Sequence, residues 1–405
     1  QIGAGIFFSQ GTSKTLLVSG SVFKNLTSWA GSGITSYNAA SVIVTGCRFE
    51  SCTAGAEAGF VLVYLSPMTL DNCTFRGGVA GGQGGAVLYS DSGVNDLTVS
   101  DSIFEDNFSP SNGGAMMSLG AKLVTISGST FEQNSAANAG AAYLYGSSII
   151  VRNATFSGNY AASVGGALYL YDTTAPYKNN ATLDNCIFFN NSAPLAAGSL
   201  GILYLANVNI YHSQFRNGIS DQGAGAYIQG IPNLLIQDTI FDSNIASQGV
   251  GLMSYYGQDV RLIRCNFTNN FAALHGPGAH LYWDYLTPDV VNGPSAFAKV
   301  IDCNFSQNHV ANPTYASGSG CITFAGYFHS EIQGGVFNYN SENVAAVTMN
   351  GGVSVLSKSP TTGLPPFMNG LTLGTHNLTL ATDSAVNGTV FLITSTLANW
   401  LGDRA

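Results

Sequence analysis

The sequence predicts an all-β protein, a right-handed, single-stranded parallel β-helix (a solenoid) of about 12–13 coils. Three observations predict this fold. A phenylalanine recurs about once per coil, a residue that tolerates a sharp bend precedes it by three positions, and an asparagine and a Gly- and Ala-rich segment follow it. Periods of 20–50 residues are typical of solenoids, in which each repeat buries its apolar face against the next.

The recurring phenylalanine sets the period. Its intervals run from 25 to 38 residues, and the longest ones contain polar insertions near residues 172–180, 284–294 and 313–317. Apolar residues alternate before it, as at Val42 and Val44, which is typical of a strand with one buried face. We therefore expect a buried ladder with one phenylalanine per coil. Its members are Phe23, Phe49, Phe75, Phe104, Phe131, Phe156, Phe188, Phe215, Phe241, Phe267, Phe305 and Phe337.

The residue three positions before each phenylalanine predicts a bend. Ten of these twelve residues are Gly, Asn or Asp, which adopt a left-handed backbone conformation at the least cost. His212 and Arg264 are the two exceptions. A single left-handed residue turns the chain sharply, so we expect two short strands in each coil that meet at this position.

An asparagine follows the phenylalanine by three positions in eight of the twelve copies. Stacked asparagines can hydrogen-bond to neighbouring backbone and to one another. A Gly- and Ala-rich segment, such as residues 113–116, then begins another strand. Antiparallel hairpins would need tight turns between strands, whereas a pattern repeated once per coil favours parallel, right-handed stacking. The predicted ladder consists of Asn107, Asn134, Asn159, Asn191, Asn244, Asn270, Asn308 and Asn340.

Two of these motifs together resemble a known repeat. Residues 104–107 read Phe-Glu-Asp-Asn, and residues 113–116 read Gly-Gly-Ala-Met; residues 156–159 and 165–168 repeat the pair. This pairing resembles the passenger repeats of the chlamydial polymorphic outer membrane proteins and of related algal and protist surface proteins. Over residues 1–350, the resemblance implies a pectin-lyase-like β-helix with an adhesive or structural role at a cell surface.

The repeat weakens after residue 350. Short apolar runs continue, but Pro360, Pro365 and Pro366 interrupt them. Solenoids need their ends covered. We therefore expect a parallel β-helix over residues 1–350 and, over residues 351–405, a β-rich C-terminal cap or the start of a further β domain.

Charge and composition exclude some classes of function. The net charge is −9 and the pI about 4.9, so no basic surface is expected for nucleic acid. No run of eighteen apolar residues occurs, so we expect no transmembrane helix in this chain. The cysteines lack metal-ligand spacing. We expect neither a metal nor a cofactor.

The seven cysteines suggest mainly buried small residues. Five of them share the position two before the phenylalanine: Cys47, Cys73, Cys186, Cys265 and Cys303. A stack of buried thiols is the simpler interpretation. Cys47 with Cys73, and Cys265 with Cys303, lie on successive coils and are candidate disulfides, although parallel in-register side chains make the geometry awkward.

Asn-x-Ser/Thr sequons predict a secreted, extracellular glycoprotein. Several fall at bends or at positions expected to face solvent, whereas the sequon at Asn107 coincides with the buried ladder. The candidate glycosylation sites are Asn25, Asn72, Asn153, Asn180, Asn190, Asn266, Asn304, Asn377 and Asn387.

The sequence shows no convergent catalytic set. Glycosidase and lyase chemistry needs carboxylates on one face, but the aspartates here mostly occupy bends. The densest polar group is Arg261, Arg264, His280 and Asp284. Tyrosines recur in or just after the Gly/Ala strand and suggest a binding stripe. They are Tyr64, Tyr89, Tyr143, Tyr145, Tyr169, Tyr171, Tyr204, Tyr227, Tyr255 and Tyr282, with Trp283 and Tyr285.

Together these features predict a non-enzymatic structural or adhesive module of a larger extracellular glycoprotein of the cell surface, cell wall or a filament. The expected partners are other copies of the chain, other surface or filament proteins, and glycans. The alternative is a β-helix that binds or degrades a polysaccharide.

Overall fold

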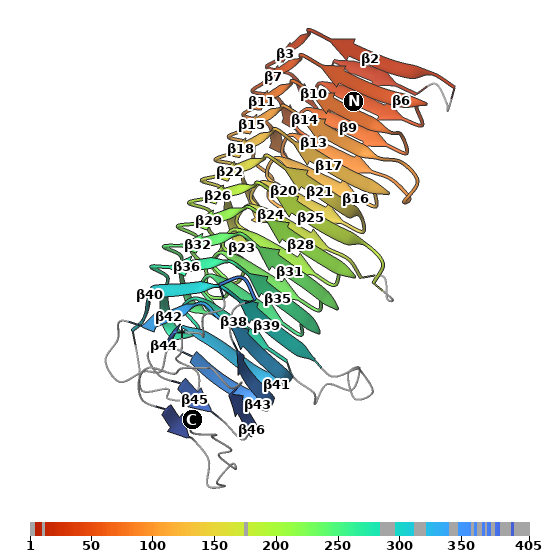
Figure 1. The fold of residues 1–405 in the computed structure, drawn as a ribbon. Coiled ribbons are helices and arrows are strands. Elements are labelled where there is room, and N and C mark those ends of the chain that lie inside the picture. The colour runs from red at the N-terminus through yellow and green to blue at the C-terminus, as the bar shows by residue number, and fades with distance from the viewer. Residues whose placement is uncertain are drawn as a thin grey trace. The chain divides into compact units, whose positions relative to one another are not determined.

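The computed structural model describes residues 5–9, 13–173, 177–283, 296–311, 321–339, 347–357, 360–362, 367–368, 371–373, 377–380 and 390–392. The chain forms two compact units, residues 1–205 and residues 206–405, which we call unit 1 and unit 2. The described residues contain strands and no helix. Within each unit the described strands pair in parallel with those of the neighbouring coils, which confirms the predicted β-solenoid (Figure 1).

Each coil of unit 1 contributes three main strands, which we name by their place in the repeat. The leading strands are β2 (Thr15–Ser19), β6 (Ser41–Thr45), β10 (Met68–Asp71), β14 (Leu97–Ser100), β17 (Leu123–Ser127), β21 (Ser148–Arg152) and β25 (Asn180–Asp184). The Phe strands are β3 (Val22–Lys24), β7 (Arg48–Glu50), β11 (Thr74–Arg76), β15 (Ile103–Glu105), β18 (Thr130–Glu132), β22 (Thr155–Ser157) and β26 (Ile187–Phe189).

The Gly/Ala strands of unit 1 follow short connecting strands. They are β1 (Ile6–Phe8), β5 (Ile34–Tyr37), β9 (Val61–Tyr64), β13 (Val87–Ser90), β16 (Met116–Leu119), β20 (Ala142–Tyr145), β24 (Leu168–Tyr171) and β27 (Leu200–Leu203). The connecting strands are β4 (Thr27–Ser28), β8 (Thr53–Ala54), β12 (Val79–Ala80), β19 (Ser135–Asn138) and β23 (Tyr160–Val164).

Unit 2 repeats the same order. Its leading strands are β28 (Asn207–Tyr211), β31 (Asn233–Gln237), β35 (Asp259–Ile263) and β39 (Phe297–Ile301). Its Phe strands are β29 (Gln214–Arg216), β32 (Ile240–Asp242), β36 (Asn266–Thr268), β40 (Asn304–Val310) and β42 (Val336–Tyr339). Its Gly/Ala strands are β30 (Ala226–Gln229), β34 (Leu252–Tyr255) and β38 (Ala279–Tyr282), and its connecting strands are β33 (Ile245–Gln248) and β37 (Phe271–His275).

The boundary expected at residue 350 falls inside a strand. The last strands are β41 (Ile322–Gln333), β43 (Val347–Ser357), β44 (Phe367–Met368), β45 (Leu371–Leu373), β46 (Asn377–Leu380) and β47 (Val390–Leu392). β43 pairs in parallel with β41 before it and with β45 and β46 after it. Parallel stacking therefore continues across residue 350 into the C-terminal segment.

The phenylalanine ladder is present in both units. All twelve predicted phenylalanines lie in Phe strands, and all twelve are buried. In unit 1 the rings of Phe104 and Phe131 stack with centroids 4.7 Å apart and planes within 1°. In unit 2 Phe241 and Phe267 also lie 4.7 Å apart. Burial of each ring contributes about 2–3 kcal/mol, and stacked pairs add roughly 1 kcal/mol.

The predicted bend occurs in all twelve copies. Every residue three positions before the phenylalanine has a positive φ, including the exceptions His212, at 46°, and Arg264, at 50°. A second bend, which the sequence did not reveal, lies two positions after the phenylalanine in eleven copies. Its residues are Asn25, Ser51, Gly77, Asp106, Gln133, Gly158, Asn190, Asn217, Ser243, Asn269 and Gln307.

The described asparagines of the ladder are buried and hydrogen-bonded to neighbouring coils. Asn134 Nδ2 donates to Phe104 O at 3.0 Å and to Asn159 Oδ1 at 3.1 Å, while Asn134 Oδ1 accepts from Asn107 N and Nδ2. Asn244, Asn270 and Asn308 repeat these contacts in unit 2. The Asn134 side chain thus binds the coils on both sides of it. Asn340 lies outside the described residues.

Cysteine replaces asparagine in one coil of unit 1. Cys52 occupies the ladder position three residues after Phe49, and Leu26 N donates to its sulfur at 3.4 Å. All seven cysteines are among the described residues, all are buried, and none forms a disulfide. Cys47, Cys73, Cys265 and Cys303 are therefore thiols in this structure, as in the simpler of the two interpretations, and the candidate disulfides are not formed.

We expect burial of the Cys73 thiol to make the stability of the protein fall at alkaline pH. Burial raises the pKa of Cys73 from 9.0 to about 11. Between these values the unfolded thiol loses a proton that the native thiol keeps, so this contribution is complete below pH 9 and is lost as pH rises toward 11. We expect urea unfolding at pH 7, 9 and 10.5 to show this decline. Cys73→Ala should make the decline shallower; an unchanged pH dependence would contradict the assignment.

Candidate functional site

The densest polar group predicted from the sequence does not form one site. Arg261 binds both carboxylate oxygens of Asp259, at 2.9 and 2.6 Å. Arg264 instead binds both oxygens of Asp238, at 2.7 Å each. His280 lies on β38, in the stack of Gly/Ala strands, whereas Arg261 lies on β35, a leading strand. Asp284 is outside the described residues.

Basic neighbours favour the charged form of two carboxylates, Glu50 and Asp238. Hydrogen bonds from Lys24 and from Arg264 lower the pKa of Glu50 and Asp238, respectively. A general acid at neutral pH needs a raised pKa instead. Glu105 also pairs with Arg76, and Glu331 with Lys299. These four carboxylates thus form ion pairs with basic side chains at the surface.

Neither a metal cluster nor a membrane-spanning helix is found in the part of the chain that the structure describes. No three or more His, Cys, Asp or Glu side chains gather there in a way that could hold a metal ion. Within the same residues, no helix has the length and apolar character that crossing a bilayer requires.

Tyrosines form an outward row along unit 1. Register places Tyr37, Tyr64, Ser90, Leu119, Tyr145, Tyr171 and Leu203 on successive Gly/Ala strands. All seven side chains are half-buried. Ring centroids lie 4.9 Å apart for Tyr37 and Tyr64, and 5.7 Å apart for Tyr145 and Tyr171. We call this set the tyrosine row.

One predicted member of the stripe points inward instead. Tyr89 is fully buried inside unit 1, and its hydroxyl has no hydrogen-bond partner among the described residues. Tyr143 and Tyr169 lie on the outward face, two residues before the row members of the same strands, with centroids 5.6 Å apart. In unit 2, half-buried Tyr255 and Tyr282 stack at 4.6 Å. Tyr285 is outside the described residues.

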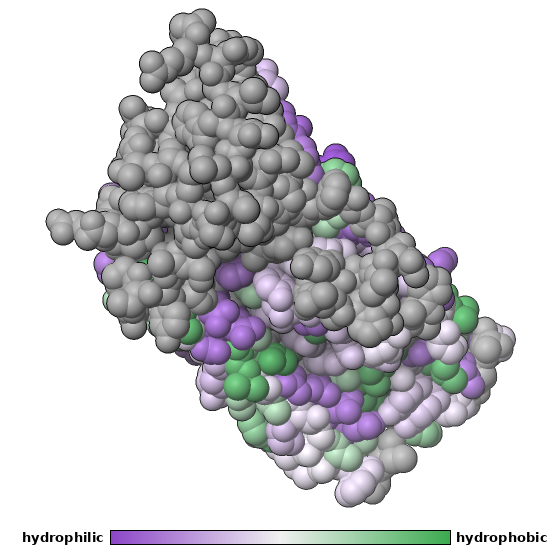
Figure 2. All heavy atoms as spheres, turned by 90° about the horizontal axis from the view of Figure 1, so that it is seen from below, coloured by the Kyte–Doolittle hydropathy of each residue, from purple (hydrophilic) through white to green (hydrophobic). Residues whose placement is uncertain are grey.

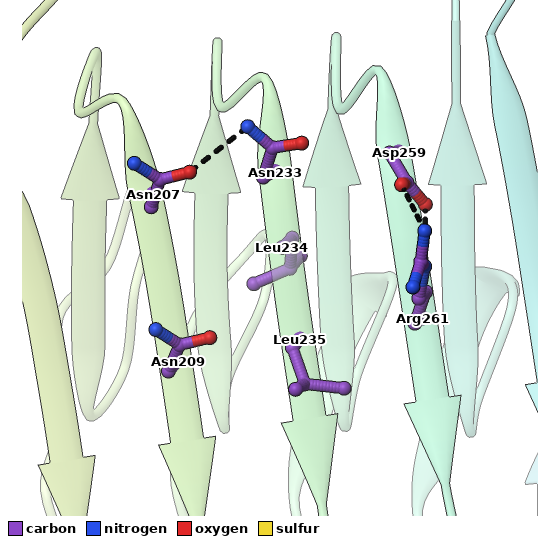
Figure 3. A pocket seen from close by; sticks show the side chains of 7 residues that line it. All are labelled: Asn207, Asn209, Asn233, Leu234, Leu235, Asp259 and Arg261. Carbon is purple, nitrogen blue, oxygen red and sulfur yellow. Dashed lines mark hydrogen bonds and ion pairs between the residues drawn. The ribbon is translucent and has the colours of Figure 1, made fainter.

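Unit 2 carries a polar hollow on the outer face of its leading strands (Figure 3). Its volume is about 290 Å³. Three strands line it, β28, β31 and β35, and Figure 3 shows their side chains in level rows. Asn233 Nδ2 donates to Asn207 Oδ1 at 2.9 Å. The lining residues are Asn207, Asn209, Asn233, Leu234, Leu235, Asp259 and Arg261.

The alternation of each strand creates this hollow. Asn207 and Asn209 face outward from β28, while Val208 and Ile210 are buried. On the next strand Leu234 and Ile236 are buried. Of the lining residues, only Arg261 was predicted from the sequence, because the rows of side chains form only when neighbouring coils are in register. The signal present in the sequence was the polar residue that begins each of these three leading strands.

Most candidate glycosylation sites are accessible. Asn25, Asn72, Asn153, Asn180, Asn190 and Asn266 are exposed, and Asn304 is half-buried. Asn377 lies in β46, and Asn387 is outside the described residues. Asn107, whose sequon coincides with the ladder, is fully buried.

The surface mixes polar and apolar residues. On the face shown in Figure 2, green apolar and purple polar residues are interspersed over the coloured part of the surface. Exposed apolar side chains recur in a row of unit 2, where Ile219, Ile245 and Phe271 occupy successive coils. The tyrosine row, the polar hollow and this short row are thus separate features of the outer surface.

Comparisons with known proteins bear on the fold. A family model described as a right handed beta helix region matches residues 2–156 and 61–218. Three solved chains match, among them a mannuronic acid specific polysaccharide family 6 lyase enzyme from human gut microbiota. That match has 9% identity and a TM-score of 0.32, and covers 93% of this chain and 82% of the lyase chain. A likeness at this level carries no argument about activity.

No curated protein matches the sequence. The resemblance to the chlamydial passenger repeats therefore stays a prediction. The family match spans residues 2–218, more than half of the 405 residues, and both units consist of stacked parallel coils. The chain belongs to the right-handed β-helix family.

Proposed function

We propose that this chain is a non-enzymatic structural or adhesive module of an extracellular glycoprotein of the cell surface, cell wall or a filament. The tyrosine row carries the proposal. Its half-buried rings lie on the outside of unit 1 in two pairs on successive coils, Tyr37 with Tyr64 and Tyr145 with Tyr171. Tyrosine is enriched at protein contact surfaces because it combines apolar area with a polar tip. Its partners would be other copies of the chain, other surface or filament proteins, and glycans.

Two further observations support a role without catalysis. The recurring phenylalanines and the seven described asparagines of the ladder are buried, and both contact the neighbouring coils. The acidic residues Glu50, Glu105, Asp238, Asp259 and Glu331 each contact a basic side chain. A polysaccharide-degrading enzyme is the competing proposal.

Adhesion and degradation can be tested on the same preparation. We expect the full chain to co-sediment with insoluble cell-wall material, and the double variant Tyr145→Ser, Tyr171→Ser to bind several-fold less. The control variant is Thr125→Ala, which changes an outward, half-buried side chain on leading strand β17; it should bind the cell-wall material normally. The chain should release no reducing ends or unsaturated products from neutral or uronic-acid polysaccharides. Product release, or equal binding by all variants, would overturn the proposal.

Glycosylation follows from the exposed sequons. After expression in a eukaryotic secretory host, we expect intact mass to drop on treatment with an N-glycosidase. Asn72→Gln and Asn153→Gln should each remove one glycan, because both side chains are exposed. Asn107 should remain unmodified in the folded protein because it is fully buried. A mass that does not change on treatment would argue against the glycoprotein part of the proposal.

A further inference from the structure

Next to the polar hollow, the outer face of the leading strands of unit 2 continues over two more coils. Register aligns Asp259 with Phe297 and then His329, and it aligns Arg261 with Lys299 and then Glu331. Phe297 is 46% exposed, and its ring centroid lies 5.8 Å from that of His329. One outer face of unit 2 thus carries, from coil to coil, the asparagine amides, the Asp259–Arg261 ion pair, the exposed Phe297 ring and the Lys299–Glu331 ion pair.

We infer that this outer face of unit 2 binds a neutral polysaccharide whose chain of sugar rings runs across the coils. The inference rests on the proposed adhesive role and names a ligand class for it. It assigns the hydroxyl-binding role to Asn209 and Asn233, and the ring-stacking role to Phe297.

The hydrogen-bonding groups suit sugar hydroxyls. An amide side chain both donates and accepts, so it can bind two neighbouring hydroxyls of one sugar ring. The Asn209 amide lines the hollow and has no hydrogen-bond partner among the described residues. Leu235 lies beside it and offers apolar contact to the C–H face of a ring. Ligand sites commonly combine a few placed polar groups with such apolar surface.

The balance of charge favours a neutral sugar over an acidic one. The guanidinium of Arg261 is bound by Asp259, and Lys299 Nζ lies 3.1 Å from Glu331 Oε2. The fields of such pairs largely cancel at a distance, and salt screens what remains. A uronic-acid or sulfated polysaccharide would need excess positive charge, whereas each of these two cations already contacts a carboxylate.

The spacing of the rows suits an extended chain of sugars. Neighbouring strands of a sheet lie about 4.8 Å apart, which is close to the length of one sugar residue in an extended β-linked glucan. Successive sugars could therefore meet equivalent rows on successive coils. Exposed aromatic rings such as Phe297 add an apolar platform against which the face of a sugar ring can pack.

Calorimetric titration of the full chain tests this inference. We expect a soluble β-1,4-linked glucan oligosaccharide to bind, and an oligogalacturonide of the same length to bind at least tenfold more weakly. Phe297→Ala and Asn209→Ala should each weaken glucan binding about five- to tenfold. Gln214→Ala, an outward amide on a Phe strand of the same unit, should leave binding unchanged.

Asn209→Asp provides a second variant of nearly the same size, which keeps an acceptor but loses the donor; it should also weaken binding. Preferred binding of the oligogalacturonide, no binding of the glucan, or equal binding by all variants would each overturn the inference. The proposed adhesive role is judged separately, because it depends on cell-wall binding through the tyrosine row of unit 1 and on the absence of degradation.

Discussion

Asn134→Ala is expected to lower the free energy of unfolding by about 3 kcal/mol or more. The substitution removes the acceptor of Asn107 N and Nδ2, and it removes the donor to Phe104 O and Asn159 Oδ1. All of these groups lie in a buried ladder that water does not reach. An unsatisfied buried polar group costs roughly 1–3 kcal/mol, and here several are left at once.

Urea unfolding followed by circular dichroism measures this loss. Asn138→Ala is the matched control, since its half-buried amide makes a single bond to Asn112 Oδ1, at 2.9 Å. We expect the control to lose less than about 1 kcal/mol. Equal losses in the two variants would mean that the asparagine ladder contributes no more than an ordinary surface hydrogen bond.

Gly140→Ala is expected to cost about 3 kcal/mol, or to prevent unit 1 from folding. A Cβ at this position would lie 2.6 Å from Tyr160 O and 2.7 Å from Tyr160 N. Both are backbone atoms of the following coil, so the clash can be relieved only by separating the coils. The glycine is required for close approach of two backbones, since its φ is not in the left-handed region.

Gly55→Ala is the control for this effect. A Cβ there would lie 3.5 Å from its nearest neighbour, Trp29 Cε3, which is an ordinary contact. We expect its thermal midpoint to stay within a few degrees of the unmodified protein, while Gly140→Ala falls clearly below it. If the two variants had the same thermal midpoint, the close approach of the coils at Gly140 would not be what makes an added Cβ destabilising there.

The scaffold could be predicted because its signals recur at fixed positions. Phe131 repeats the environment of Phe104 and Phe156, so one register identified all three. The first bend was visible because Gly, Asn and Asp dominate it, and the context of the fold imposes the same φ on His212 and Arg264. The second bend was missed, since Gln133 and Ser243 carry no left-handed preference of their own.

The outer surface was harder to predict. Both faces of the Gly/Ala strand are apolar, so the inward direction of Tyr89 could not be distinguished from the outward direction of Tyr145. The polar hollow depends on three strands about 26 residues apart, and only the coil-to-coil register brings Asn233 beside Asn207. The tight fit at Gly140 likewise depends on how closely two coils approach.

The repeated asparagine contact has a consequence for how the protein changes over evolutionary time. Along the asparagine ladder of unit 1, Asn107, Asn134 and Asn159 present the same amide to the next coil, beside the same stacked phenylalanine ring. Gain or loss of one whole coil would leave matching surfaces on the two coils that become neighbours, and it would change the length of the solenoid by about 4.8 Å. A gain or loss of a few residues within a strand would instead misalign every ladder at once. Length in such a protein should therefore vary in whole coils, with irregular insertions confined to the turns.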